Sequence, residues 1–256
     1  MKYTHRLAIL SSFGLLAIPS QAQVTLTGAG YLETFDALGT GLPAGWSVRT
    51  GATATAPGTP VAFSGVTYAW SGTGGGFHNY ASTDGLGSGT TAALQAAAPD
   101  RALGLRQTSS LGDPGAAFVL QVADTLGYQD FQLGFAFHLV DEEGRVGTWA
   151  VDYALGATPS AFTSLGSFSR DLWGSQPESY ALPNEVNNQA QPLWIRVAAL
   201  NPATGTGSRD SVALDDFALR YRPTSSSAVP EPGAWTLAAS IGLLGLGAWR
   251  TIRRRA

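Results

Sequence analysis

Apolar and polar residues alternate with a period of two along several stretches of the chain. From Phe131 to Val140 every second residue, beginning with Phe131, is aromatic or leucine, and the residues between them are small or polar. The stretch from Thr148 to Leu155 alternates in the same way, with Trp149 and Val151 on its apolar face. This pattern predicts half-buried β-strands, because successive side chains of a strand point to opposite faces.

Two further strands are predicted at Ala117–Ala123 and Leu193–Leu200. Asp141–Arg145, which contains a glycine, is expected to be a hairpin connection between the two alternating stretches. The glycine-rich stretches Gly39–Gly58 and Ser71–Gly89 are expected to be long surface loops. Outside its two ends the chain has no helical period of comparable strength, so we expect an all-β, antiparallel β-sandwich.

The last predicted strand, Ser211–Tyr221, contains a change of phase. Its apolar residues before Asp215 occupy one face, and those after Asp216 are one residue out of step. A phase change inside a strand is what a β-bulge produces, so a bulge is expected at the two aspartates. The alternative is an edge strand with two solvated carboxylates.

The N-terminus has the three parts of a secretory signal peptide. Lys2 and Arg6 belong to a basic segment, Leu7 to Ile18 is apolar, and small residues precede a cleavage point after Ala22. We therefore expect residues 1–22 to be a signal peptide removed by signal peptidase.

The C-terminus is a second targeting segment. A Ser-rich linker, 223–229, leads to Pro230-Glu231-Pro232 and then to the uncharged run 234–249. A helix rises about 1.5 Å per residue, so this run is just long enough to cross a hydrocarbon core of roughly 30 Å. We expect one transmembrane helix there, held on the cytoplasmic side by the basic residues that follow it. Those residues are Arg250, Arg253, Arg254 and Arg255.

This order of Pro-Glu-Pro, one helix and a basic end, over residues 230–256, resembles the PEP-CTERM sorting domain of Gram-negative bacteria. The resemblance implies processing at the Pro-Glu-Pro motif by an exosortase-type membrane enzyme. The protein would then be exported, held transiently in the inner membrane, and finally placed at the cell surface or in the extracellular matrix.

Charge and cysteine content limit what the exported domain, 23–222, can do. It has no lysine, and its nine arginines stand against 17 acidic residues, which gives a net charge of −8. Such a surface repels nucleic acid and anionic lipid, and it suits divalent cations or neutral glycans better. The chain has no cysteine, which excludes disulfides, thiolate metal sites and cysteine nucleophiles.

Three pieces of the domain together resemble the jelly-roll (concanavalin-like) modules of secreted bacterial adhesins. Glu33–Asp36 followed by Leu42–Trp46 is similar to their opening strand, and Leu214–Leu219 to their closing strand. Gly75–Ser82 with Asp100–Leu105 is similar to a glycine-rich loop and the strand after it.

Many such modules carry a structural calcium ion between their first and last strands. The matching positions here are Glu33, Asp36, Asp215 and Asp216, so the resemblance implies a calcium site on these residues. Calcium takes six to eight oxygen ligands at about 2.3–2.6 Å, which carboxylates and backbone carbonyls can supply together.

Aromatic side chains near predicted loops are candidates for stacking on sugar rings. The alternative for each of them is packing in the core or under a loop. The candidates for glycan contact are Trp46, Trp70, Phe77, Tyr80 and Trp173.

Catalytic motifs are missing from the sequence. Asp141, Glu142 and Glu143 lie in the expected turn, where solvated charge is the ordinary explanation, and no Glu-x-Asp-x-x-Glu pattern occurs. His78 and His138 belong to no zinc or nucleophile motif. We therefore expect a non-enzymatic structural or adhesive protein associated with exopolysaccharide. The alternatives are a carbohydrate-binding module with structural calcium and, less favoured, a surface glycan hydrolase.

Overall fold

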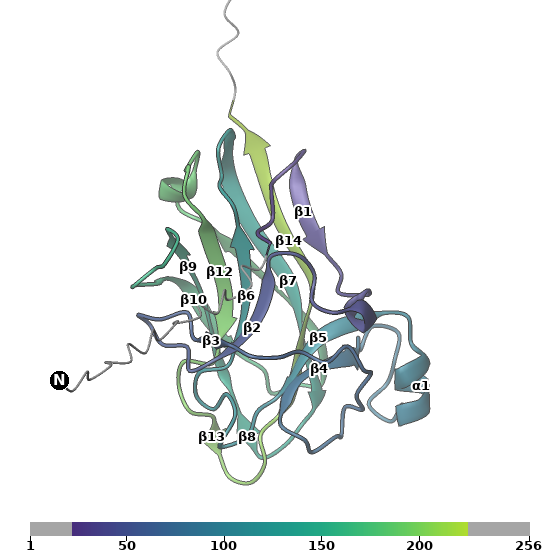
Figure 1. Cartoon of the computed structure of the whole chain (residues 1–256). Helices are drawn as coiled ribbons and strands as arrows, with labels where there is room; N and C mark the ends of the chain where they lie inside the picture. The colour runs from purple at the N-terminus through teal and green to yellow at the C-terminus, as the bar shows by residue number, and fades with distance from the viewer. Residues whose placement is uncertain (1–21, 225–256) are drawn as a thin grey trace, which may run out of the picture.

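The computed structural model describes residues 22–224. These residues form a sandwich of two antiparallel, six-stranded sheets (Figure 1). Sheet I has the order β11-β7-β14-β5-β4, with β1 paired to β14, and sheet II has the order β10-β9-β12-β6-β2-β3. The predicted signal peptide, the Pro-Glu-Pro motif and the run 234–249 lie outside the described residues.

The strands differ widely in length. Sheet I contains β1 (Gly30–Glu33), β4 (Gly76–Ala81), β5 (Arg101–Arg106), β7 (Tyr128–Asp141), β11 (Gly174–Ala181) and β14 (Ser211–Pro223). Sheet II contains β2 (Trp46–Thr50), β3 (Thr59–Pro60), β6 (Ala117–Val122), β9 (Thr148–Leu155), β10 (Thr163–Ser169) and β12 (Leu193–Ala198). The remaining elements are the ribbon of β8 (Arg145–Val146) and β13 (Thr204–Gly205), the helix α1 (Ala92–Ala97), and the 3-10 turns η1 (Leu38–Thr40) and η2 (Asn184–Val186).

The apolar faces of the two sheets meet in one core, as the alternating pattern predicted. Phe131, Phe137 and Leu139 of β7 are fully buried there, and so is Val151 of β9. The chain passes repeatedly from one sheet to the other, for example from β5 in sheet I to β6 in sheet II and back to β7. The prediction of an antiparallel β-sandwich is therefore confirmed, and the alternation between sheets is that of a jelly roll.

Three local predictions are wrong. Asp141–Arg145 is not a hairpin connection, because β7 and β9 belong to different sheets and Arg145 enters the β8–β13 ribbon. The stretch Gly39–Gly58 contains β2, and Ser71–Gly89 contains β4. Glycine-rich composition masked these strands, whose pairing depends on neighbours distant in sequence.

The predicted bulge in the last strand is confirmed. The register between β14 and β7 shifts between Asp215 and Ala218, and Asp216 has a φ of 46°. The first part of β14 pairs with β5 through Leu214, and the later part pairs with β1 from Phe217 onwards. The two aspartates therefore mark the point at which β14 changes its partner from β5 to β1.

No helix among residues 22–224 is long and apolar enough to span a membrane.

Candidate functional site

A groove crosses the outer face of sheet I over strands β11, β7 and β14. Small residues form its floor, namely Gly134 and Ala136 of β7 and Ala218 of β14. Ser179 of β11 and Ala218 lie on either side of Gly134 in register. The outward positions of these strands carry little side-chain volume, so the curved sheet is left hollow, with a cavity of about 450 Å³.

The groove continues into a second hollow of about 590 Å³. Gln132 and Arg220, which face each other in register, line both hollows. The second hollow then passes between Asn184 and Arg222. We call the two hollows together the sheet I groove. The first hollow carries the exposed carboxylates of Asp84 and Asp216. Arg220 lies where the two hollows meet, and Arg222 lies in the second hollow.

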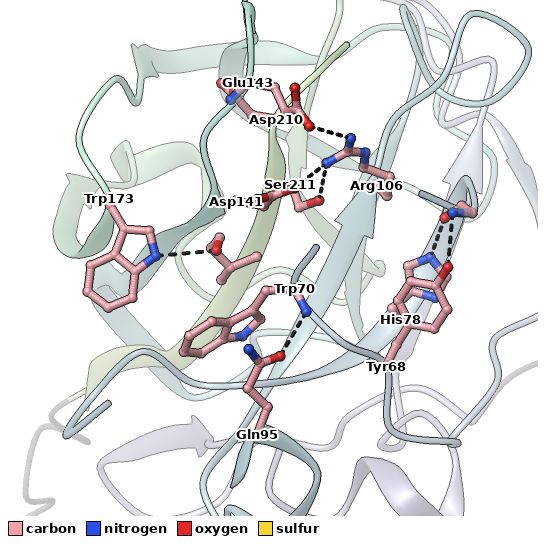
Figure 2. Close-up of polar contacts among 12 residues, drawn as sticks. Tyr68, Trp70, His78, Gln95, Arg106, Asp141, Glu143, Trp173, Asp210 and Ser211 are labelled. Carbon is pink, nitrogen blue, oxygen red and sulfur yellow. Dashed lines mark hydrogen bonds and ion pairs between the residues drawn. The ribbon is translucent and has the colours of Figure 1, made fainter. Parts of the chain in front are cut away.

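Loops cover the part of sheet I next to the groove. Trp70 and Tyr80 are buried there, and Trp173 packs edge-on against Trp70 with ring centroids 5.9 Å apart (Figure 2). The indole N–H of Trp70 donates to the carbonyl of Ala81 at 2.9 Å, and its backbone N–H donates to the Gln95 side chain at 2.9 Å. These contacts give the aromatic rings a packing role.

Four of the five aromatic candidates for glycan contact are therefore wrong. Trp70 and Tyr80 are 2% and 0% exposed. Trp46 and Phe77 lie inside the sandwich at 1% and 4%, where Trp46 packs edge-on against Phe217 at 4.8 Å. A buried ring has no face to offer a sugar. Trp173 is half-buried, and its indole N–H donates to Val140 at 3.3 Å.

Asp215 is buried beneath the acidic end of the groove. Its Oδ1 accepts the backbone N–H of Asp216 at 2.8 Å, and its Oδ2 lies 3.8 Å from Nε2 of His138. Burial raises the pKa of Asp215 to about 8 and lowers the pKa of His138 to about 4. At pH 7 His138 is therefore neutral and Asp215 is mostly protonated, so their contact is mainly one between uncharged groups. His138 is fully buried and is covered by Thr83, whose hydroxyl lies 2.7 Å from Nδ1.

Further carboxylates gather at the same end. Burial raises the pKa of Asp100, and the neighbouring charges of Asp36, Asp84 and Asp216 raise it further. Asp36 also accepts the backbone N–H of Arg101 at 3.0 Å, which joins the first loop to β5. Burial also raises the pKa of Asp216, and the charges of Asp84 and Asp36 raise it further, so these carboxylates lie near enough to act on one another electrostatically.

The predicted calcium site is incomplete in this arrangement. Glu33 accepts the backbone N–H of Phe35 at 3.0 Å, and burial raises its pKa. Within residues 22–224 no three Asp, Glu, His or Cys side chains converge closely enough to hold a metal ion. The residues as placed therefore do not fit a calcium ion, and its binding stays a prediction.

The acidic run Asp141–Glu143 belongs to a structural network instead of a solvated turn. The guanidinium of Arg106, which is 4% exposed, donates to Asp141 at 2.8 Å and to Glu143 at 3.0 Å (Figure 2). It also donates to Ser211 of β14 at 2.9 Å. Because two of its carboxylates are held by a buried arginine, this run gives no support to the hydrolase alternative.

The sequence reasoning missed the floor of the groove, although it noted that the second face of β7 is small and polar. Gln132, Gly134 and Ala136 are every second residue of that strand. Three consecutive outward positions with so little apolar volume indicate an open face. They do not reveal that β11 and β14 supply matching small residues on both sides.

Some solved structures are similar to this chain, but no comparison shows its family. No protein family matches the chain, and no curated protein matches it in sequence. Among solved structures it is similar to a cleaved adhesin domain of Lys-gingipain from Porphyromonas gingivalis, with a TM-score of 0.43 and 17% identity over 75% of this chain and 98% of that one. It is also similar to the CBM22-1 xylan-binding domain of Xyn10C from Paenibacillus barcinonensis, with a TM-score of 0.42 and 11% identity over 78% of this chain and 100% of that one. Both scores are below 0.5, so the account of this protein rests on its own geometry.

Proposed function

We propose that this is an exported cell-surface or matrix protein that binds polysaccharide along the sheet I groove and so acts as an adhesive or structural component. The observation that carries this proposal is the continuous groove over β11, β7 and β14, which is open at the surface and floored by small residues. A polymer needs an open channel that it can enter along its length. A closed pocket would suit a small molecule instead.

The groove also offers the chemistry that sugar hydroxyls require. Gln132 and Asn184 each provide an amide with donors and an acceptor, and Ser175 and Ser179 provide hydroxyls along β11. Sugar C–H groups can lie against the flat floor of Gly134 and Ala218. With Trp46, Trp70, Phe77 and Tyr80 buried, binding depends on hydrogen bonds and shape, and we expect it to be weak for each sugar residue and stronger along a chain.

Gly134 offers a way to close the groove without disturbing the fold. A Cβ built on this glycine meets only the carbonyl of Glu178 at 3.7 Å, an ordinary contact. Gly134→Tyr should therefore place a ring in the channel, while Gly134→Ala should leave it open. Affinity electrophoresis through gels containing different polysaccharides compares the two variants with the wild-type protein.

The proposal predicts that at least one polysaccharide retards the wild-type protein and Gly134→Ala, and that Gly134→Tyr migrates as it does in an empty gel. Equal retardation of all three proteins would place binding outside the groove. Migration of the wild-type protein unaffected by any polysaccharide would contradict a binding function.

Delivery to the surface is the second part of the proposal. It rests on the signal peptide ending at Ala22 and on the tail from Pro230 to Arg255, which resembles substrates of an exosortase-type enzyme. Cell fractionation with antibody to the domain tests it. Domain-containing protein without its tail should accumulate outside the inner membrane. Full-length protein that stays permanently in the inner membrane would contradict processing.

We also propose calcium as a structural ligand at the acidic end. Burial, and after it the repulsion between neighbouring carboxylates, raises the pKa values of Asp100 and Asp216, and a divalent cation would relieve that repulsion. Since no three carboxylates converge within residues 22–224, binding would require Asp84 and Asp36 to move towards Asp216.

A further inference from the structure

The exposed positive charge of the described domain is confined to one place. Its nine arginines are its only permanently cationic side chains, because residues 23–222 contain no lysine. Seven of these arginines are buried or half-buried, and only Arg220 and Arg222 are exposed. Both line the second hollow of the sheet I groove.

The other arginines are mostly engaged within the fold. Arg196 forms a two-bond ion pair with Asp152 at 2.6 and 2.8 Å, and Arg101 donates to the side chain of Asn79 at 2.7 Å. Ion pairs or hydrogen bonds likewise hold Arg49, Arg106, Arg170 and Arg209. By contrast, within residues 22–224 no side-chain hydrogen bond or ion pair involves Arg220 or Arg222.

The placement of the two free guanidinium groups fits a chain that carries regularly spaced anions. They are two residues apart on one strand, which corresponds to about 7 Å along it. Arg220 lies opposite Gln132, and Arg222 lies opposite Gln129 after a shift in register. Guanidinium groups bind carboxylates through two parallel N–H···O bonds. The exposed Asp130 also lines this hollow but forms no ion pair with either arginine in the described structure.

We infer that the ligand of the sheet I groove is an acidic polysaccharide whose uronate carboxylates bind Arg220 and Arg222. This inference rests on the proposed function and names its substrate class. A nucleic acid or an anionic bilayer would bring dense negative charge against a domain whose net charge is −8. A sparsely charged polysaccharide lying in the groove would meet less repulsion. At the other end the carboxylates of Asp84 and Asp216 would repel uronates, so only uncharged sugar residues are expected to bind there.

The test compares polygalacturonate with the same polymer after reduction of its carboxyl groups to alcohols. Full-length protein in non-ionic detergent is titrated with each polymer, and the dissociation constants are measured by calorimetry. We expect the carboxyl-reduced polymer to bind at least about tenfold more weakly. Raising the salt concentration should weaken only the binding of the charged polymer.

Variants assign the effect to the two arginines. Arg220→Gln combined with Arg222→Gln should lower the affinity for polygalacturonate to that for the reduced polymer. The corresponding double Lys variant keeps the charge but not the paired N–H···O bonds, and its affinity should fall between those of the wild-type protein and the Gln variant. Thr206→Glu combined with Ser208→Glu adds the same change in charge at exposed positions away from the groove and serves as the control. It should stay within about threefold of the wild-type protein.

The outcomes separate this inference from the proposed function. Equal binding of both polymers, blocked by Gly134→Tyr, would overturn the acidic ligand and leave the groove as a polysaccharide site. If the Thr206/Ser208 control loses as much affinity as the Gln variant, net charge alone would explain the loss, and the inference that Arg220 and Arg222 bind the ligand would be overturned. An oligodeoxythymidylate that binds as tightly as polygalacturonate would refute the ligand class. Failure of any neutral or acidic polysaccharide to bind would refute both proposals.

Discussion

Asp215→Asn should change how the stability of the protein depends on pH. In the folded protein, burial holds the pKa of Asp215 at about 8, against an ordinary value of 3.8. The folded state therefore binds the proton more tightly than the unfolded state, and stability decreases as the pH rises from about 4 to about 8. Asparagine is neutral at every pH and keeps the acceptor for the N–H of Asp216, so this variant should lose that part of the pH dependence.

The useful window lies between pH 6.5 and pH 8. His138, whose pKa is lowered to about 4 from 6.5, has the opposite effect, since its unfolded form takes up protons below pH 6.5. Between pH 6.5 and pH 8 that contribution changes by only about 0.4 kcal/mol, and it is the same in the wild-type protein and in Asp215→Asn. One pKa unit corresponds to about 1.4 kcal/mol. Because Asp215 is only partly protonated as the pH approaches 8, the free energy of unfolding that it contributes should fall by roughly 2 kcal/mol between pH 6.5 and pH 8. For a domain of this size that is about 4–8 °C in melting temperature.

The assay is thermal unfolding at pH 6.5 and pH 8 in the presence of chelator, followed by circular dichroism. The melting temperature of the wild-type protein should fall between the two pH values, and that of Asp215→Asn should fall by much less. Asp171→Asn, at an exposed position, is the control and should behave as the wild-type protein does. An equal fall in wild-type protein and Asp215→Asn would show that Asp215 is ionised at neutral pH, and the description of the groove's acidic end would be wrong.

Three more measurements test other parts of the account. Calcium at one hundred times its dissociation constant should stabilise the wild-type protein by about 3 kcal/mol, and so raise its melting temperature, but should leave that of Asp216→Ala unchanged; no rise in the wild-type protein would end the metal proposal. Arg196→Met should lower the free energy of unfolding, measured with chemical denaturant, by about 3–5 kcal/mol, because it leaves Asp152 buried without its partner. Adding Asp152→Leu should recover part of this loss, and an Arg196→Met variant as stable as the wild-type protein would contradict the buried pair. Gly104→Ala should destabilise by about 1–3 kcal/mol, because its Cβ would lie 1.9 Å from the ring of Tyr80, so wild-type stability in that variant would mean that the packing over sheet I is looser than described.

Much of the fold could be predicted from residue patterns because each pattern has a local physical cause. The alternation from Thr148 to Leu155 gives the bounds of β9, and the phase change at Asp215 gives the bulge in β14. The partners of these strands could not be predicted in the same way. Period two shows which face is buried but not which strand lies beside it, and so Asp141–Arg145 was mistaken for a hairpin.

The site was harder to predict than the fold for a related reason. The sequence is as compatible with stacking of Trp70 and Trp46 on sugars as with their packing inside the protein. Only the loops over Trp70 and the packing of Trp46 between the sheets decide between these roles. The groove depends on small residues, such as Gly134 and Ala218, that come together from separate strands. The significance of Arg220 depends on the burial of the other arginines within the fold, which the sequence pattern does not reveal.

The central claim is that polysaccharide lies on the outer face of sheet I, and nuclear magnetic resonance tests it most directly. An oligosaccharide cut from the polymer that retards the protein most strongly is titrated into labelled protein. The account predicts shifts of the amide signals of Gly134, Ser179 and Ala218, with those of Ser164 and Ser167 in sheet II unchanged. Shifts confined to sheet II or to the loop around Trp173 would contradict it.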